Sequence, residues 1–312
     1  MMGLVSIFMD VEDPINPLAD DAALDFARLF TEAGVRGSFC ITGEKCRKLI
    51  ERGRQDVIEA FRPHCLGLHT DTHSYHPTTM ELLADLGYEE GCRAALEAES
   101  KGCEAFQRAF GRLPAFWGGA GNTWSPEIPF TLKELNIPAY VYSLTEVLGG
   151  DFHRFNGAFA LPQSASYPED SVIEEPPIWK SPNRDWTGVF VGHPTRYRFP
   201  DYWDRSYYAG QTPETLDLQS PISEDRYRSG LANMKKLLSR IAVESTVIGV
   251  DDFLQMPWKF RDPNAKELGA FAKKTSENIR NVGRWPIHKP DLSVDRIIEK
   301  TLALYNTLEV RL

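Results

Sequence analysis

The feature that most constrains the fold of this chain is a series of short apolar runs separated by helix-like stretches. Residues 4–9, 37–42 and 65–68 are such runs, and their length is typical of buried strands. Between the first two, residues 20–33 carry apolar side chains at helical spacing, and Gly34 follows as a C-terminal cap would. Strands that are joined through helices usually pair in parallel. The pattern therefore predicts an α/β fold whose parallel sheet is either doubly wound or closed into a barrel.

The second half of the chain continues this pattern less regularly. Residues 139–143, 188–191 and 246–250 are further strand candidates. Between residues 149 and 186 the periodicity weakens and several prolines occur. We therefore expect a long loop insertion there, and loops of that length are often functional.

Composition and charge exclude several kinds of protein. The chain has 42% apolar and 25% charged residues and a net charge of −9, a balance that suits a globular protein without a basic nucleic-acid surface. No run approaches the ~18 apolar residues of a membrane span. The first ten residues also lack the basic start and the longer apolar stretch of a signal peptide. We therefore expect a cytoplasmic protein without nucleic-acid or membrane partners.

The cysteines predict neither disulfides nor a thiolate metal site. They are odd in number, and no two of them form a CxxC pair. Reduced thiols are the expectation that follows. The five are Cys40, Cys46, Cys65, Cys92 and Cys103.

Four of the seven histidines lie close together, in and just before the sequence GLHTDTHSYHPT. His69 and His73 are four residues apart and directly follow the predicted strand at 65–68. On a helical turn this spacing would place both imidazoles on one face, as a chelating metal pair requires. Taken alone, the pair is a weak signal, and surface histidines are the more frequent explanation of such spacing. We expect structural or supporting roles for His64 and His76.

A second group of polar residues follows the first predicted strand. In FMDVEDP the apolar run ends in Asp10, Glu12 and Asp13. Active sites of parallel α/β folds form at the carboxyl ends of strands. Three carboxylates so close together repel one another unless a cation or strong donors lie between them. A solvated turn before a helix is the alternative interpretation of this stretch.

A third strand end that carries a polar side chain is in GVFVGHPTRY, where His193 follows the strand candidate at 188–191. Three separate strand ends therefore each carry side chains that suit metal binding or acid–base chemistry. A coincidence of three is much less expected by chance than any one of them.

The order of these elements resembles the polysaccharide deacetylase (NodB-homology) family. The likeness rests on the acidic strand end, the HTxxH motif and the late strand-end histidine. It spans roughly residues 4–255, and GSFCITG resembles the family's second strand. The resemblance implies an α/β fold that is a distorted (β/α) barrel of about seven strands. It predicts a barrel domain over residues 1–258, with the insertion at about 149–186, and a helical extension over residues 259–312 that packs on the barrel.

The resemblance also implies an activity, the metal-dependent hydrolysis of a linear amide such as the N-acetyl group of an amino sugar. His69 and His73 would be metal ligands, and Thr70 would hold the small hydroxyl position between them. Asp10 would be the base that activates the attacking water, and His193 the acid that protonates the leaving amine. Two histidines and a carboxylate suit zinc, although other first-row metals accept the same ligands.

Two departures from the family pattern concern the acids and an arginine. The family's first motif commonly has two adjacent aspartates, whereas here Val11 and Glu12 separate Asp10 from Asp13. Either Glu12 or Asp13 could then be the third metal ligand. In the stretch GRLPAFWGGAGNTW, Trp117 stands where the family's arginine is expected. Either another cation replaces that arginine, or the pKa of Asp10 is set by other groups.

Aromatic residues are the candidates for substrate contact. Residues 197–220 are rich in Tyr, Trp and Phe, interleaved with Arg and Asp. This composition fits a sugar-binding wall, core packing or a contact in a homo-oligomer. The predicted substrate-binding residues are Thr70, Trp117, Tyr142 and Tyr197.

The expected substrate is an N-acylated sugar or another small amide. One alternative keeps the chemistry and changes the substrate to a formamido sugar or a ureide in the cytoplasm. A second is a carbohydrate-binding barrel without catalysis, which would need neither Asp10 nor His193. A third is an unrelated α/β protein with incidental histidines.

Overall fold

The computed structural model shows nine strands among the residues that it describes, and they form one sheet. It describes residues 3–83, 85–122, 125–142, 152–155, 158–166, 169–175, 179, 186–205, 218–264, 266–267, 270, 273 and 299–300. The strands are β1 (Leu4–Val11), β2 (Ser38–Ile41), β3 (Cys65–Leu68), β4 (Trp117–Gly118), β5 (Ala139–Tyr142), β6 (His153–Phe155), β7 (Ala158–Ser166), β8 (Trp186–Gly192) and β9 (Thr246–Val247).

The strand pairings lead from β1 around to β1 again. They run through β2, β3, β4, β5, β7 and β8, and every one of these pairs is parallel. The link from β3 to β4 is the thinnest, with the single pair Leu68 and Trp117. Strand β6 adds to β7 in antiparallel orientation. The predicted α/β class and the distorted (β/α) barrel of about seven strands are thus confirmed.

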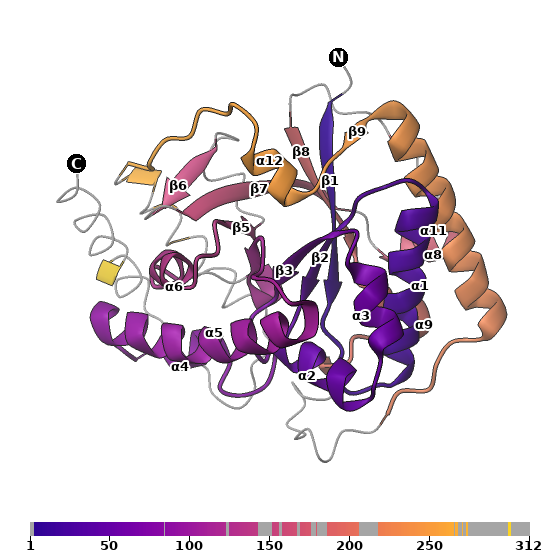
Figure 1. Cartoon of the computed structure of the whole chain (residues 1–312), viewed down its shortest axis with the longest axis horizontal. Coiled ribbons are helices and arrows are strands. Elements are labelled where there is room, and N and C mark those ends of the chain that lie inside the picture. The colour runs from indigo at the N-terminus through magenta and orange to yellow at the C-terminus, as the bar shows by residue number, and fades with distance from the viewer. Residues whose placement is uncertain are drawn as a thin grey trace.

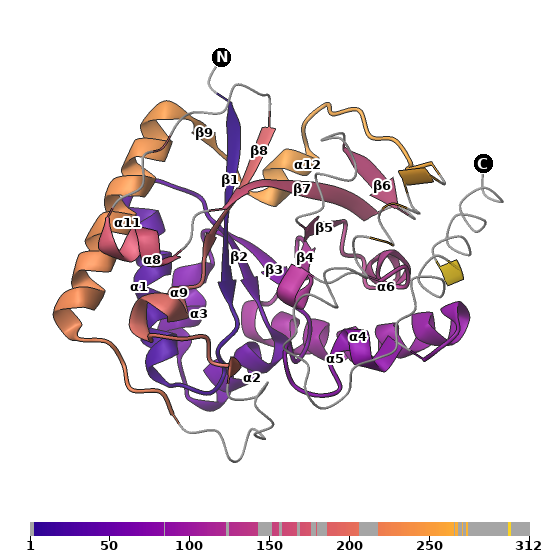
Figure 2. The ribbon, with the colours of Figure 1, turned by 180° about the vertical axis from the view of Figure 1, so that it is seen from behind.

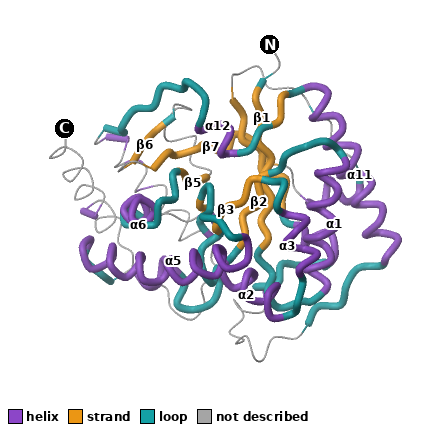
Figure 3. Tube along the Cα trace, in the orientation of Figure 1, coloured by secondary structure: helices purple, strands orange, loops and turns teal. Residues whose placement is uncertain are grey.

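Helices surround the strands on the outside, as Figures 1 and 3 show. Helices α1, α3 and α11 cover one side of the sheet and α5 and α6 another (Figure 1). The view from behind shows α8 beside α11 and α9 beside α1 (Figure 2). The helices are α1 (Leu18–Glu32), α2 (Gly43–Glu51), α3 (Gln55–Phe61), α4 (Thr79–Leu83), α5 (Tyr88–Phe110), α6 (Ile128–Glu134), α8 (Glu169–Glu174), α9 (Pro194–Arg198), α11 (Glu224–Glu244) and α12 (Val250–Leu254), with a short 3-10 turn at Ala120–Asn122.

Helix ends follow the local sequence. Helix α1 stops before Gly34, whose φ of +67° is a left-handed conformation that glycine adopts without strain. Gly111 ends α5 in the same way, with φ +69°. The Thr42 hydroxyl caps α2 by accepting a hydrogen bond from the Lys45 backbone N–H. The glycine that ends α1 explains why this helix could be located from the sequence.

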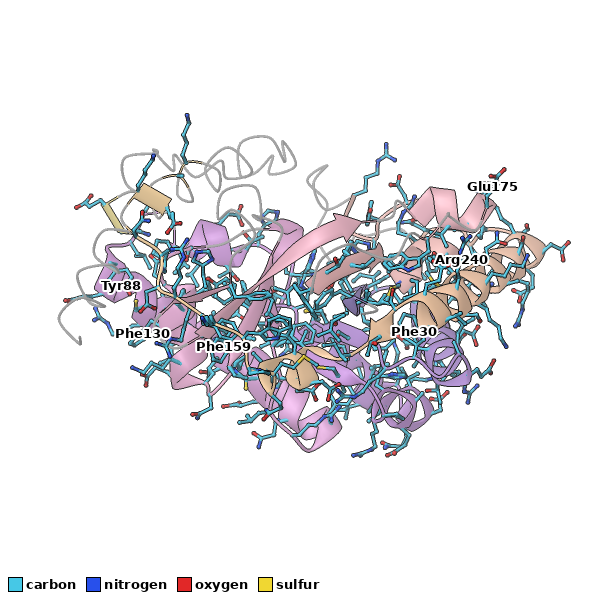
Figure 4. All side chains as sticks on the ribbon, turned by 90° about the horizontal axis from the view of Figure 1, so that it is seen from above. Phe30, Tyr88, Phe130, Phe159, Glu175 and Arg240 are labelled. Carbon is cyan, nitrogen blue, oxygen red and sulfur yellow. The ribbon has the colours of Figure 1, made fainter. Side chains whose placement is uncertain are left out.

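The core lies between the strands and the outer helices. Phe30 of α1 packs edge-on against Phe39 of β2, with ring centroids 5.2 Å apart, and Phe39 in turn packs against Phe61 of α3. All three rings are fully buried. Figure 4 shows Phe30 among closely packed side chains and Glu175 at the outer edge of the molecule. Burial of such aromatic rings is a large stabilising term in a domain of this kind.

The stretch expected as a loop insertion, 149–186, contains β6, β7 and α8. Strand β7 lies between β5 and β8 and is therefore part of the barrel. Strand β7 was not predicted from the sequence, because Pro162 interrupts its apolar residues and because the residues that follow are small or polar. Most of the predicted helical extension at 259–312 lies outside the described residues. Where it is described, the Lys300 ammonium is 2.8 Å from the Glu127 carboxylate.

Strand β1 changes its neighbour part of the way along its length. Its first residues, Leu4 and Val5, pair with β9, and its last four pair with β2. At the end where β9 and β2 part, Arg36 joins the two segments, with its guanidinium 2.5 Å from the carboxylate of Asp251 and also paired with Asp252. These ion pairs therefore bridge the place where β1 changes its neighbour from β9 to β2. We call this place, at the amino end of the barrel, the seam.

A buried ionic group fixes the loop from β1 to α1. The Lys45 ammonium is 1% exposed and lies 2.5 Å from an Asp20 carboxylate oxygen. It also donates to the Asp13 carbonyl at 2.6 Å, while Arg52 donates to Asp20 and to the Pro14 carbonyl. A buried charge is tolerated only when it is paired and hydrogen-bonded. This network therefore holds the residues that follow the acidic end of β1.

All five cysteines are buried and free, as expected. Among the described residues, no helix has the length and apolar character that crossing a membrane requires.

A buried carboxyl joins α5 to β4. Glu99 is 1% exposed, and it accepts hydrogen bonds from the Trp117 indole N–H and the Thr79 hydroxyl, each at 3.1 Å. Burial raises the pKa of Glu99 to about 7, although these two donors oppose the shift. Glu99 therefore changes its charge near neutral pH.

We predict that Glu99→Gln removes a pH dependence of stability. A carboxyl whose pKa rises on folding stabilises the folded state fully below its unfolded pKa, and this contribution is lost as pH rises through the folded pKa. Between pH 4.5 and 7 the wild type should therefore lose up to about 3 kcal/mol relative to the variant. Urea unfolding across this range measures the difference.

The matched control is Glu97→Gln on the same helix, because Glu97 is largely exposed and pairs only loosely with Lys101. It should unfold with the wild-type pH dependence. A wild type that gains stability relative to Glu99→Gln as the pH rises from 4.5 to 7 would show that the carboxylate, and not the carboxylic acid, is the form that folding favours.

Candidate metal centre

Five polar side chains meet at the carboxyl ends of three strands. Asp10 and Glu12 lie at the end of β1, and His69 follows β3 directly. His73 belongs to the turn after His69, and His193 follows β8 and begins α9. Parallel pairing brings these ends to the same edge of the barrel. The structure thus brings together the three chemical elements that the sequence separates.

The Glu12 carboxylate lies in the middle of the histidines. Its Oε2 atom is 2.9 Å from His73 Nε2, 3.3 Å from His69 Nε2 and 3.7 Å from His193 Nε2. The side chain is only 3% exposed. Such a carboxylate requires positive charge nearby, from protonated imidazoles or from a cation.

Asp10 lies beside Glu12 and faces two of the same histidines. Its Oδ2 atom is 3.5 Å from His69 Nε2 and 3.8 Å from His193 Nε2. Within the described part of the chain, these histidines are the ion-pair partners of Asp10, and no arginine or lysine joins them. The family's motif arginine therefore has no replacement among the described residues.

Burial and the neighbouring charges shift the pKa values of this cluster in opposite directions. Burial alone would raise the pKa of Glu12, but His73, His193 and His69 hold this pKa well below its ordinary value. Burial also opposes protonation of His69, yet Asp10 and Glu12 bring the pKa of His69 well above its ordinary value. For Asp10, burial outweighs the histidines and raises the pKa.

Asp13 is turned away from this cluster. One of its oxygens accepts hydrogen bonds from the backbone N–H groups of Ile15 and Asn16, at 2.9 and 3.0 Å. The other accepts from the Asn16 amide at 2.8 Å and from the Thr195 hydroxyl at 3.0 Å. The carboxylate of Asp13 therefore fastens the loop after β1, whereas that of Glu12 faces the histidines.

The turn that carries His69 and His73 is not helical, so the expected helical geometry is wrong. Thr70 and His73 have φ values of +57° and +52°, which are rare for residues with a side chain. The Thr70 hydroxyl accepts a hydrogen bond from the His73 N–H at 3.0 Å and so closes the turn. The two imidazoles still face each other, with ring centroids 4.8 Å apart. Backbone strain of this kind is maintained by the surrounding structure and is typical of functional sites.

Helices α2 and α5 hold this turn in place. The backbone N–H groups of Gly43 and Glu44, at the start of α2, donate to the carbonyls of Thr70 and Asp71 at 3.1 and 2.8 Å. Gly102 of α5 allows the close approach, since a Cβ there would lie 2.9 Å from the Asp71 Cα. The strained conformation is therefore supported from two sides.

The donor set fits a divalent metal ion. In the described part of the chain, three groups of side chains have ligand atoms close enough to share an ion: Glu12, His69 and His73; Asp10, Glu12 and His193; and Asp10, Cys40 and His69. In the first group, the His69 Nδ1 atom donates to the Gly118 carbonyl at 2.9 Å, so the Nε2 atom, which faces the carboxylates, is the one that would bind the ion. Two imidazole nitrogens and a carboxylate are a set that zinc and related metals accept.

The residues predicted to bind substrate lie in other surroundings. Trp117 is 2% exposed, and its indole N–H is used by Glu99. Tyr197 is fully buried, with its ring 4.7 Å from that of Phe26. The structure describes Tyr142 only as the last residue of β5, and its side chain lies outside the described residues. Thr70 belongs to the turn itself.

Two aromatic residues that the sequence did not single out lie beside the cluster. The Tyr202 ring meets the His193 ring edge-on at 5.1 Å, and the Trp203 ring is 5.9 Å from that of His73. Both belong to the aromatic segment from residue 197, in which Tyr197 was the residue predicted to contact substrate. Cys40, which is paired with Asp10 in the β1–β2 register, was missed as well.

Comparison with solved structures supports the fold. A Mycobacterium smegmatis protein assigned to the polysaccharide deacetylases aligns with a TM-score of 0.51 and 12% identity, over 84% of this chain and 95% of its own. A 4-alpha-glucanotransferase from Thermococcus litoralis aligns with a TM-score of 0.54 and 10% identity, over 91% of this chain and 47% of its own. A peptidoglycan deacetylase from Bacillus subtilis has a TM-score of 0.44, 10% identity and coverages of 90% and 97%.

No protein-family model matches the chain, and no curated protein matches its sequence. The first two alignments, at identities this low, establish a shared fold. Because a deacetylase-type protein and a glucanotransferase share it, the fold alone does not select the reaction.

The two carboxylates after β1 should separate in a metal-binding experiment. We predict that Glu12→Gln loses metal, because it replaces the oxygen that faces His69 and His73 with a neutral amide. Asp13→Asn should keep the metal and lose about 1–3 kcal/mol of stability, since it disturbs a fully hydrogen-bonded carboxylate. Zinc content after dialysis and thermal unfolding measure the two effects. Metal loss in Asp13→Asn together with retention in Glu12→Gln would reverse the assignment.

Proposed function

We propose that this chain is a metal-dependent hydrolase of the deacetylase type, acting on the linear amide of an N-acylated amino sugar. The observation that carries the proposal is the convergence of Glu12, His69 and His73 on one point, with Asp10 and His193 beside it. The first three would hold the metal, and the last two would transfer protons. The chain shares its fold with a deacetylase-type protein, and this fold is compatible with the proposed reaction but does not select it.

The division of labour follows from the positions of the side chains. A divalent metal at this place would polarise the amide carbonyl and acidify water. Asp10 would accept a proton from the attacking water at its carboxylate, which lies on the His69 side of the cluster. His193 would donate a proton from its imidazole to the departing nitrogen, because an amine leaves an amide poorly without one. Tyr202 would orient His193 through the edge-on ring contact.

Aromatic side chains near the cluster support a sugar-like substrate. Tyr75 and Tyr202 are both partly exposed, and the Trp203 ring lies between the site and Tyr75, 5.7 Å from the latter. Aromatic faces and their polar tips suit the mixed polar and apolar surface of a sugar ring. A small formamide or ureide would need less of this surface and is the second substrate class to screen.

The environment of Asp10 favours one further candidate, a sugar-binding barrel without turnover. Asp10 has no cationic partner besides histidine within the described residues, and Trp117 uses its N–H for Glu99. A base without a supporting cation could be inactive. Such a protein would still bind sugar, and its affinity would not depend on Asp10 or His193.

We predict that Asp10→Asn and His193→Ala each lose about two to four powers of ten in turnover while zinc stays bound. The reason is that both groups would move protons and neither would be needed to hold the metal. Amine release from acetylated and formylated amino sugars, together with zinc content, is the measurement. Full activity in His193→Ala would contradict this mechanism. No amine release from any substrate, with unchanged sugar binding in both variants, would favour the binding protein.

The histidine pair provides a separate test of the metal. We predict that His69→Ala and His73→Ala each lose zinc and activity, because each removes one of the two Nε2 atoms that face Glu12. His76→Ala is the matched control from the same segment, since the His76 imidazole contacts the Glu81 carboxylate at 2.7 Å. The control should keep its zinc. Stoichiometric zinc in both of the first two variants after dialysis would rule out the proposed ligands.

A further inference from the structure

Behind His73, a chain of hydrogen bonds leads away from the site. The Nδ1 atom of His73 is 2.7 Å from the Ser74 hydroxyl, and that hydroxyl donates to the Asp204 carboxylate at 2.6 Å. All three side chains are buried, with 6%, 2% and 4% of their surfaces exposed. The contact between Ser74 and Asp204 joins residues that are 130 positions apart in the sequence.

The direction of each hydrogen bond follows from the groups involved. A carboxylate can only accept, so the Ser74 hydroxyl gives its proton to Asp204. The Ser74 oxygen is then an acceptor towards His73, and Nδ1 must carry the proton of the imidazole. The other ring nitrogen, Nε2, then faces the Glu12 carboxylate at 2.9 Å, where it can donate to the carboxylate or, with a metal present, would bind the ion.

We propose that Ser74 and Asp204 are positioning residues that fix the tautomer and ring orientation of His73 for metal binding. The proposal rests on the proposed function, because it assigns these residues to the same metal centre. Partners of this kind around a metal-binding histidine set both the ligand geometry and the affinity for the ion. Here the carboxylate acts through a serine hydroxyl, since Asp204 itself is 3.8 Å from His73 Nδ1.

The segment that carries Asp204 contacts the site with three consecutive residues. Tyr202 meets the His193 ring and Trp203 the His73 ring, while Asp204 accepts from Ser74. One short segment after α9 therefore supports both a ligand and the proposed acid. A displacement of this segment would disturb both at once.

The two metal-binding histidines differ in how they are oriented. His69 donates to the Gly118 carbonyl, a backbone group that no substitution removes. His73 depends on two side chains, which substitution can remove one at a time. The orientation of His73 is thus the part of the centre that can be tested without altering a ligand.

The test compares zinc affinity in the full-length chain and three variants: Ser74→Ala, Asp204→Asn and the double variant. Competition with a chelating dye measures the affinity. We expect Ser74→Ala to weaken zinc binding by about 10- to 100-fold. Because Asp204 would act only through Ser74, the double variant should be no weaker than Ser74→Ala alone. Ser6→Ala is the matched control, as Ser6 is a buried serine that hydrogen-bonds Ser38. It should bind zinc as the wild type does.

A second readout reports the tautomer directly. At saturating zinc, in protein labelled with ¹⁵N at histidine, His73 should show an Nδ1–H signal protected from solvent exchange in the wild type and in Ser6→Ala, and Ser74→Ala should lose this protection. Wild-type zinc affinity in Ser74→Ala, or additive losses in the double variant, would overturn the proposal alone. A wild-type chain that binds no divalent metal would overturn the proposed function, and this inference with it.

Discussion

The carboxylate of Glu12 is buried among three imidazoles, and much of the surrounding structure can be understood as what keeps it there. An isolated carboxylate in such a place would be strongly destabilising. The histidines compensate by carrying positive charge, as the raised pKa of His69 indicates, or by sharing a cation with the carboxylate. Both solutions require the imidazoles to stay within about 4 Å, and this requirement explains the strained turn at Thr70 and His73.

Around this cluster, the supporting groups form two layers with different roles. The Lys45–Asp20 pair fixes the loop after β1 and holds Asp13, and the start of α2 holds the turn after β3. These groups set the backbone. The Gly118 carbonyl and the Ser74–Asp204 pair then set the imidazole rings. Because separate groups fix the backbone and the rings, the side chains of the site can be held in a defined geometry although they come from three strands.

Sequence patterns predicted the fold class and the residues of the cluster, because both depend on local features. Apolar runs and helix caps locate β1, α1, β2 and β3. Strand β7 was missed, since Pro162 and its polar neighbours conceal a strand that is formed by pairing with β5 and β8. The choice between Glu12 and Asp13 also needed the structure, as adjacent carboxylates differ only in which way the loop turns them. Ser74 and Asp204 lie far apart in the chain, so no local pattern could have joined them.

The seam in the barrel has a consequence for how this protein can change over evolution. The chemistry lies at the carboxyl ends of the strands, whereas the partition of β1 between β9 and β2 lies towards the opposite end and is bridged by Arg36 and two aspartates. Partly exposed ion pairs of this type tolerate exchange of their members, since each adds little to stability. Substitutions at the amino end of the barrel should therefore cost less stability than substitutions at the end that carries the buried cluster of carboxylates and histidines. Divergence of this kind leaves a recognisable shape long after the residues that built it have been replaced.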